Sequence, residues 1–288
     1  MFPVPPGACD CHTHVFGPAA SFPFAAGRTY TPGEAPPDAL LELQNALGLD
    51  RVVLVQPSPY GADNACMLDG LRRLGPARGR GVAVIDEGTT EAALRDMHDA
   101  GVRGVRINLH TAGRTDPAMA RAMLLGAARR VASLGWHVQA YTELSVIAAL
   151  RDTILDLPGG LVIDHFGRPE GRRGLSQPGL DALLDLLRAG AVHVKLSAAH
   201  RLSDWPDCED MAPLARAMIE ANPDRVLWGS DWPHAGPSGG GSDPSAVHPF
   251  RQVDDRRALA RLAEWAGDEG RLRRLLVTNP ARLYGWPL

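Results

Sequence analysis

Short apolar runs alternate with longer amphipathic stretches along most of this chain. In the longer stretches apolar residues recur at helical spacing, whereas the short runs have the length and composition of buried strands. This order is typical of strand–helix units that build a parallel sheet. The predicted strands are residues 8–15, 51–56, 81–86, 102–109, 136–142, 161–165, 192–197 and 225–231. Predicted helices include residues 37–47, 90–100, 118–134, 144–155, 180–188 and 210–221.

Eight strand–helix units predict a closed (β/α)8 TIM barrel, an α/β fold, rather than an open doubly wound sheet. The length of 288 residues and the 45% hydrophobic content suit one barrel domain that spans residues 1–288. A dinucleotide-binding fold is not expected, because no Gly-x-Gly-x-x-Gly follows the first strand. The Gly-, Pro- and Ser-rich stretch 236–245 is interpreted either as a mobile lid over the barrel mouth or as a surface insertion.

Composition and charge limit the classes of partner and the cellular compartment that this chain is expected to have. The net charge of −3 gives no electrostatic footprint for nucleic acid or for an anionic membrane surface. Four cysteines are too few for a disulfide scaffold. The first residues lack the pattern of a signal peptide, and no run of about 18 apolar residues predicts a membrane span. We therefore expect a cytoplasmic protein whose partner is a small molecule.

The most informative motif is Cys-Asp-Cys-His-Thr-His at residues 9–14. His12 and His14 are two residues apart on a predicted strand, so both imidazoles should project to the same face. Cys9 and Cys11 have the opposite parity and should point toward the outer helices. The motif is therefore not interpreted as a Cys/His zinc cluster.

Polar side chains follow seven of the eight predicted strands, where a barrel of this kind has its active site. Any one of them could be a hydrogen-bonded core residue, but seven at the same end are hard to explain by packing. In chain order these residues include His12, His14, Gln56, Ser58, Arg106, Asn108, Gln139, Tyr141, Asp164, His165, Arg168, Lys195, Ser197, Arg201, Ser230 and Asp231.

His12, His14, His165 and Asp231 at these positions resemble the amidohydrolase superfamily, and further segments resemble the 2-pyrone-4,6-dicarboxylate hydrolase family. That family also contains sugar-acid lactonases and lactone isomerases. The resemblance extends from Cys9 to Trp286. Its segments are CHTHVFGP (11–18), FPFAAGRTYTP (22–32), VQPS (55–58), GADN (61–64), GVRGVRINL (101–109), IDHFGRP (163–169), VKLS (194–197), WGSDWPH (228–234) and NPARLYGW (279–286).

The resemblance implies metal-independent hydrolysis of a lactone that carries carboxylates. Asp231 would be the general base that activates water, and His12, His14 and His165 would polarise the carbonyl and stabilise the oxyanion. The residues that match substrate-binding positions of the family are Ser58, Arg106, Arg114, Tyr141, Arg168 and Arg201. Arginine suits this role because its planar guanidinium binds a carboxylate through two parallel hydrogen bonds.

A zinc ion is the alternative cofactor, since His12, His14, His165 and Asp231 are acceptable ligands. Against it, the fourth strand offers Arg106 and the fifth offers Tyr141, where metal-dependent relatives place a bridging Lys or Glu and a histidine. Nearby arginines would also disfavour a dication. No cofactor is therefore expected.

Three further polar residues have expected roles outside this group of four. His137 lies at the start of its strand and is expected to be structural. His234 is the one remaining histidine expected as a candidate ligand contact. Lys195 should either orient the site electrostatically or pair with Asp86.

Three other functions stay open on the same sequence. A sugar-acid lactone hydrolase or isomerase would share the scaffold, a Zn-dependent amidohydrolase or decarboxylase would use the same four polar residues, and a degenerate barrel would only bind organic anions. The absence of a Gly-x-Ser-x-Gly motif argues against a serine hydrolase.

Overall fold

The computed structural model describes residues 3–288 apart from 111–112, 114–115 and 237–242. Eight parallel strands form one sheet in the order β1-β3-β4-β5-β6-β7-β8-β9. Two backbone hydrogen bonds close the sheet between β1 and β9, from His14 N to Trp232 O (2.8 Å) and from Asp231 N to His12 O (2.9 Å). The predicted TIM barrel is confirmed. Its strands are β1 Cys9–Thr13, β3 Arg51–Val55, β4 Gly79–Ala83, β5 Val102–Asn108, β6 His137–Tyr141, β7 Leu161–Ile163, β8 Val192–Ser197 and β9 Val226–Gly229.

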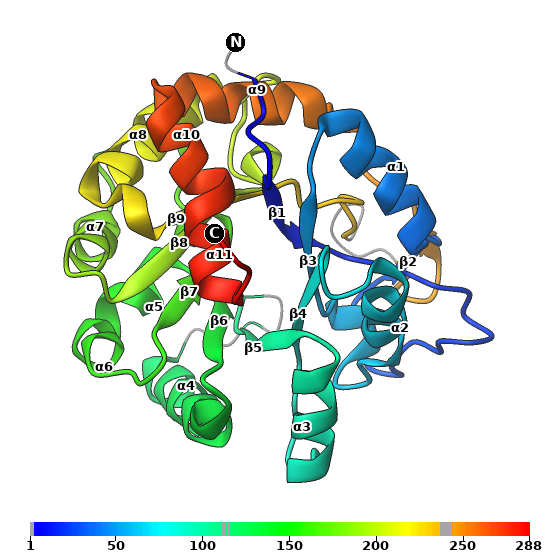
Figure 1. Ribbon diagram of the computed structural model, residues 1–288. Coiled ribbons are helices and arrows are strands. Elements are labelled where there is room, and N and C mark those ends of the chain that lie inside the picture. Colours follow the sequence, from blue (N-terminus) through cyan, green and yellow to red (C-terminus); the bar gives the residue numbers. More distant parts are fainter. Residues whose placement is uncertain (1–2, 111–112, 114–115, 237–242) are drawn as a thin grey trace.

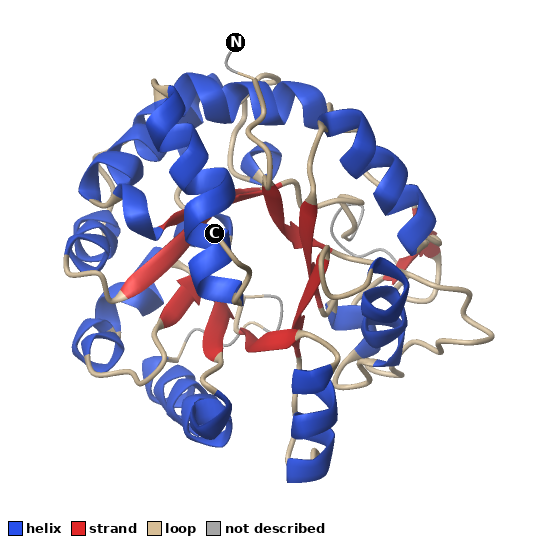
Figure 2. Cartoon of the chain, in the orientation of Figure 1, coloured by secondary structure: helices blue, strands red, loops and turns tan. Residues whose placement is uncertain are grey.

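Helices surround the strands on the outside of the barrel (Figures 1 and 2). Helix α1 has the predicted bounds, whereas the predicted helix 144–155 is divided at Leu150 into α5 and α6. The helices are α1 Pro37–Leu47, α2 Ala65–Leu74, α3 Glu91–Asp99, α4 Pro117–Val131, α5 Leu144–Ala149, α6 Arg151–Leu155, α7 Leu180–Arg188, α8 Ala212–Ala221, α9 Asp255–Ala266, α10 Glu269–Arg273 and α11 Asn279–Tyr284. None of the described helices is both long and apolar enough to cross a bilayer.

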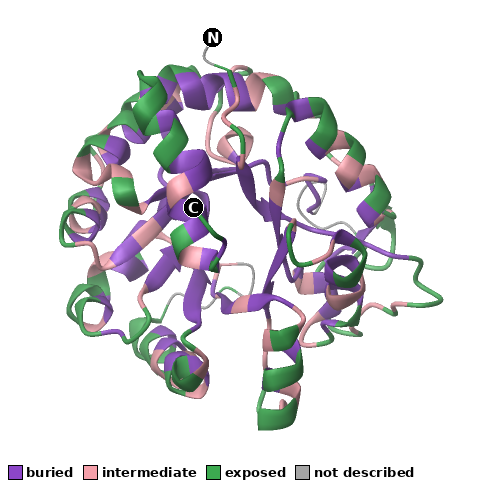
Figure 3. Cartoon of the chain, viewed as in Figure 1, coloured by how far each residue is buried: buried purple, intermediate pink, exposed green. Residues whose placement is uncertain are grey.

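Side-chain chemistry at the helix ends explains where several helices start and stop. The side chains of Thr90 and Asp254 accept hydrogen bonds from backbone N–H groups in the first turns of α3 and α9. Gly48 ends α1 with a φ of 73°, a left-handed conformation that glycine adopts without a steric penalty. The buried helix faces then pack against the strands, which are buried along most of their length (Figure 3).

The interior of the barrel below the mouth is filled by small and branched side chains. Cys9 and Cys11 pack there with residues from β3, β4, β7 and β9 and with Tyr284 and Trp286 from the C-terminal segment. Helices α10 and α11 lie across the barrel in Figure 1. The end of the barrel opposite the mouth is thus covered by the last residues of the chain.

The predicted orientation of the two cysteines is wrong. Cys9 and Cys11 face the barrel interior, whereas Asp10 faces α1 and accepts a hydrogen bond from Gln44 Nε2 (3.3 Å). The register between β1 and β3 shifts between Asp10 and Thr13, as in a β-bulge. Because of this irregularity, Cys11 and His12 both face inward although they are adjacent in sequence.

A second, two-stranded parallel sheet was not predicted. It pairs β2 (Thr31–Pro32) with β10 (Val247–His248). Thr31 Oγ1 also donates a hydrogen bond to Pro244 O (2.7 Å). The sheet joins the loop after β1 to the segment after β9. The predicted lid 236–245 lies partly outside the described residues, since 237–242 are not described.

Candidate active site

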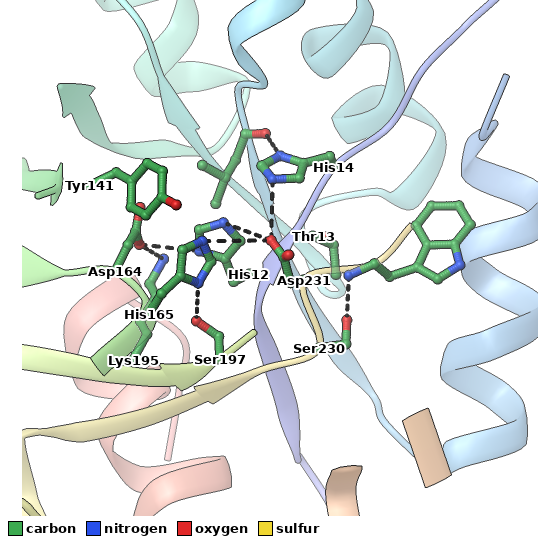
Figure 4. A network of polar contacts seen from close by, with 12 residues as sticks. His12, Thr13, His14, Tyr141, Asp164, His165, Lys195, Ser197, Ser230 and Asp231 are labelled. Carbon is green, nitrogen blue, oxygen red and sulfur yellow. Dashed lines mark hydrogen bonds and ion pairs between the residues drawn. The ribbon is translucent and has the colours of Figure 1, made fainter. Parts of the chain in front are cut away.

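The four residues expected to carry the chemistry meet at the carboxyl end of the barrel (Figure 4). His12 lies on β1 and His14 just beyond it, His165 follows β7, and Asp231 follows β9. The Nε2 atoms of all three histidines lie 3.7 Å from Asp231 Oδ1. Each of the four side chains is at least nine-tenths buried. Side chains more than 200 residues apart in the sequence therefore form one compact group.

Each histidine is oriented through its other ring nitrogen. His12 Nδ1 lies 3.2 Å from Asp164 Oδ1, His14 Nδ1 lies 2.7 Å from the carbonyl oxygen of Val55, and His165 Nδ1 lies 2.8 Å from Ser197 Oγ. The carboxylate and the carbonyl can only accept, so the Nδ1 atoms of His12 and His14 carry the protons. A serine hydroxyl can donate, so His165 is free to carry its proton on Nε2.

Asp231 is held as a carboxylate. Burial raises its pKa, but the adjacent Arg201 guanidinium and the three histidines outweigh burial and hold that pKa well below its usual range. Arg201 Nε donates a hydrogen bond to Asp231 Oδ2 (2.9 Å), and Arg201 Nη2 donates to Ala235 O. The backbone of Asp231 has a φ of 71°, which turns the chain sharply at the end of β9. Oδ1 is thus the oxygen of Asp231 that faces the histidines.

A second buried carboxylate, Asp164, lies on the barrel axis behind His12. Burial raises its pKa, but His12, Lys195 and Arg106 lower it well below its usual range. Lys195 Nζ donates to Gln139 Oε1 (2.6 Å) and lies 3.7 Å from Asp164 Oδ1. The expected alternative pairing of Lys195 with Asp86 is therefore wrong: Asp86 lies beyond the end of β4 and is exposed, whereas Lys195 is buried in the barrel.

Burial keeps His12 and His165 neutral in the absence of a ligand. Desolvation lowers the pKa of His12 to about 4, even though Asp164 opposes this shift. Burial also lowers the pKa of His165 well below its usual range, against the attraction of Asp231. A neutral His12 with its proton on Nδ1 presents a bare Nε2 lone pair toward Asp231.

A cavity of about 640 Å³ opens above Asp231, and we call it the main cavity. His14, His165 and Asp231 reach its wall, whereas His12 lies beneath them. Five of the six predicted substrate-binding residues line it: Ser58, Arg106, Tyr141, Arg168 and Arg201. Arg168 Nη1 donates to Tyr141 Oη (2.6 Å) at this wall. The sixth, Arg114, lies outside the described residues.

Other residues of the main cavity were missed from the sequence. Tyr30 and Arg251 reach it from loops outside the strand–helix pattern, and His110 lies two residues beyond β5. His200 also lines the cavity, whereas the expected His234 does not and is instead paired with Asp255 (Nε2 to Oδ2, 3.1 Å). His234 nevertheless has a ring nitrogen within 4.8 Å of ligand atoms of His200 and Asp231, so its contact with a ligand stays a prediction. The proximity of His200 to Arg201 in sequence was the signal that could have identified His200.

The donor atoms of this group are of the kinds that bind zinc. One atom each from His12, His165 and Asp231 lie within 4.8 Å of one another, and His14 Nε2 faces the same carboxylate. Three cationic side chains, Arg106, Lys195 and Arg201, contact the two carboxylates of the site. The carboxylate charge that would offset a dication is therefore already matched by protein cations.

The family model, two relatives and one solved structure all relate this chain to the same group of proteins. The model of the amidohydrolase family matches residues 9–286. The chain is 38% identical to a 2-pyrone-4,6-dicarboxylate hydrolase of Comamonas testosteroni, covering 100% of this chain and 92% of that protein. It is 35% identical to a 4-sulfomuconolactone hydrolase of Hydrogenophaga intermedia, covering 99% and 90%. A crystal structure of a probable 2-pyrone-4,6-dicarboxylic acid hydrolase from Acinetobacter baumannii with citric acid bound superposes with a TM-score of 0.80 at 27% identity, covering 97% of this chain and 99% of the other.

Proposed function

Because this chain belongs to the amidohydrolase family, we propose that it hydrolyses a lactone that carries carboxylate groups, such as 2-pyrone-4,6-dicarboxylate. The observation that carries this proposal is the ionised Asp231 facing three imidazoles at the floor of a cavity lined by arginines. The names of the two relatives, both lactone hydrolases, support an enzyme that acts on a lactone.

Asp231 acts as the general base. Its carboxylate is ionised at neutral pH, so it can take a proton from water as the water oxygen attacks the lactone carbonyl. The Nε2 atoms of His12 and His14 face the same oxygen of Asp231. The bare Nε2 of His12 helps to hold the water by accepting its second hydrogen bond. The proton on Asp231 then passes to the ring oxygen that leaves when the lactone opens, which regenerates the carboxylate.

His165 stabilises the oxyanion that forms on the carbonyl oxygen. Ser197 Oγ lies 2.8 Å from Nδ1. When this hydroxyl donates to Nδ1, the neutral ring carries its proton on Nε2 and can donate it without being protonated further. Donors that are oriented before the reaction contribute most in a buried site.

The cationic wall holds the carboxylates of the substrate. Arg106, Arg168 and Arg201 line the main cavity, and Tyr141 and Ser58 add neutral donors. Several arginines facing one cavity repel one another unless an anion lies between them. The citric acid in the related crystal structure is itself a tricarboxylic acid, which is consistent with this cradle.

We propose that this hydrolysis needs no metal ion. The charge argument supports it, since a zinc ion beside Arg106, Lys195 and Arg201 would add a dication where cations already outnumber carboxylates. The second candidate is a zinc-dependent enzyme, which the convergence of the His12 and His14 Nε2 atoms on Asp231 Oδ1 favours. His12, His14, His165 and Asp231 would hold the ion, and it would polarise the lactone carbonyl.

The test is a panel of lactones offered to the purified protein while its metal content is measured. The panel contains 2-pyrone-4,6-dicarboxylate, the monocarboxylated 2-pyrones and sugar-acid lactones. We expect hydrolysis of the dicarboxylate by protein with far less than one equivalent of metal, unchanged after chelation. Turnover confined to sugar-acid lactones would contradict the proposed substrate class, and activity lost on chelation and restored by zinc would contradict the metal-free reaction.

A further inference from the structure

A second hollow of about 380 Å³ lies beside the main cavity, and we call it the side compartment. The two spaces share Thr29, Ser58, Arg106 and Asn108 in their walls. The side compartment runs from this shared wall over the ends of β3, β4 and β5 toward α4. It is therefore open to a group attached to any ligand of the main cavity.

The wall of the side compartment differs in chemistry from that of the main cavity. Its outer part is formed by Val84 and Ile85 after β4, Ile107 on β5 and Met123 on α4. Among the described residues, β4 is the strand whose end contributes no side chain to the main cavity. The other strands end in residues that line the main cavity. At the end of β4 the side chains are apolar instead, and they line the side compartment.

The apolar wall is fixed rather than loose. Both backbone polar groups of Val84 are bonded to the side chain of Asn64: Val84 N donates to Oδ1 (3.0 Å) and Nδ2 donates to Val84 O (2.8 Å). Asn64 is itself buried. Ile107 lies within β5 and Met123 within α4, so these two side chains come from regular elements of the scaffold.

Arg106 marks the border between the two spaces. Asp164 Oδ2 lies 3.3 Å from its Nε, which fixes the guanidinium where both spaces meet. On the proposed function, Arg106 binds a substrate carboxylate. A group on the ring carbon beside that carboxylate then points into the side compartment.

We infer that the preferred substrate bears an uncharged hydrocarbon substituent on the lactone ring, next to a carboxylate, and that the side compartment receives it. This inference rests on the proposed function and narrows its substrate class. Each methylene transferred from water to an apolar wall strengthens binding about fourfold. A propyl group, allowing for incomplete burial, should improve binding by about tenfold.

Binding of stable ring analogues tests the inference without turnover. Benzene-1,3-dicarboxylate has its two carboxylates in the same relation as 2-pyrone-4,6-dicarboxylate. It can be compared by calorimetric titration with its 2-propyl and 4-propyl derivatives, each of which carries the propyl group next to a carboxylate. The variants are I85F, which narrows the side compartment, and L175F, a matched enlargement of an exposed residue. The parent dicarboxylate serves as the reference ligand in every protein.

We expect at least one propyl derivative to bind the wild-type protein about tenfold more tightly than the parent. I85F should abolish this gain and leave the affinity for the parent within about twofold, while L175F should keep the gain. Equal affinity of the wild-type protein for all three ligands would overturn the inference. Equal weakening of all three ligands by I85F would also overturn it, because the side compartment would then be a route by which ligands enter the main cavity. If the parent fails to bind and no carboxylated lactone is hydrolysed, the proposed function itself fails, and the inference with it.

Discussion

At the scale of single residues, we propose that the Ser197 hydroxyl donates to His165 Nδ1 and thereby favours the tautomer with its proton on Nε2. Its hydroxyl lies 2.8 Å from Nδ1, and Nε2 faces Asp231. Without that hydroxyl, the Nδ1–H tautomer of the ring competes, and Nε2 then has no proton to donate to the oxyanion. The side chain thus acts on the reaction through His165, as groups that orient histidines commonly do.

Replacing Ser197 by alanine should lower kcat about tenfold or more and leave KM nearly unchanged, because only the transition state carries the oxyanion. Steady-state kinetics on the hydrolysed lactone measure both constants. Ser176→Ala, at an exposed position, is the control. A normal kcat in Ser197→Ala would show that the Ser197 hydroxyl does not set the tautomer of His165.

A substitution of Arg168 tests whether the arginines of the main cavity bind the carboxylates of the substrate. It lines the main cavity, and the hydrogen bond described for its side chain is the one that it donates to Tyr141 Oη. Arg168→Met should raise KM for a dicarboxylated lactone by roughly tenfold to a hundredfold, since a charged hydrogen bond contributes about 1.5–3 kcal/mol.

The comparison with a monocarboxylated lactone decides whether the effect is specific. KM for a lactone that lacks the bound carboxylate should change much less in Arg168→Met. Arg172→Met is the matched control, because Arg172 is exposed and pairs with Glu170. An equal rise in KM for both lactones would mean that Arg168 does not bind a substrate carboxylate.

At the scale of elements, the seam between β1 and β9 joins His12 to Asp231, the proposed general base. Asp10 Oδ1 accepts the backbone N–H groups of His12 (3.1 Å) and Ser230 (3.0 Å), one on each side of the seam. Burial raises the pKa of Asp10 to about 6, although these hydrogen bonds oppose the shift. The carboxyl therefore binds its proton more tightly in the folded chain than in the unfolded chain.

The stability of the fold should consequently depend on pH through Asp10. The folded chain binds more protons than the unfolded chain between about pH 4 and pH 6, so this stabilisation is present below pH 4 and is lost as the pH rises through 6. Relative to Asp10→Asn, whose amide oxygen can still accept both bonds, the wild-type chain should lose roughly 3 kcal/mol of unfolding free energy across this window. Denaturant unfolding of both proteins at pH 4 and pH 7 measures it, and parallel pH profiles would refute it.

The elements also show how far sequence reasoning reaches. All eight barrel strands could be located because each is a short apolar run between helical patterns. The irregularity of β1 could not be predicted from the sequence, because a bulge depends on how β1 pairs with β3 and leaves no mark on the composition. His12, His14, His165 and Asp231 lie among the polar strand ends, and the resemblance to the amidohydrolase superfamily singled them out. Tyr30 and Arg251 instead come from loops that have no periodic pattern.

At the scale of the whole molecule, the barrel is used differently at its two ends. The mouth holds the polar site, and the opposite end is covered by Tyr284 and Trp286, which pack against Cys9 and Cys11. Arg80 Nε donates to Tyr284 O (3.0 Å), and its guanidinium lies over the Trp286 ring at 4.7 Å. The C-terminal segment is thus anchored to β4 and completes the core beneath the site.

Truncation of this cover should destabilise the fold without altering the chemistry. Tyr284→Ala removes a fully buried ring and should cost about 3–5 kcal/mol of unfolding free energy. Leu288→Ala, at an exposed terminal residue, should cost almost nothing. Denaturant unfolding measures both, together with kcat of the folded protein. A loss below about 1 kcal/mol in Tyr284→Ala would contradict the role of the cover.

The central claim is that Asp231 activates water in a site without a metal ion. The most direct test is kcat of metal-depleted wild-type protein and of Asp231→Asn on the same carboxylated lactone, with metal content determined on the same samples. We expect full activity in the depleted wild type and a loss of roughly a hundredfold to ten-thousandfold in Asp231→Asn, with its fold intact by circular dichroism. Near-normal turnover in Asp231→Asn, or a wild-type rate that follows the bound metal, would contradict the account.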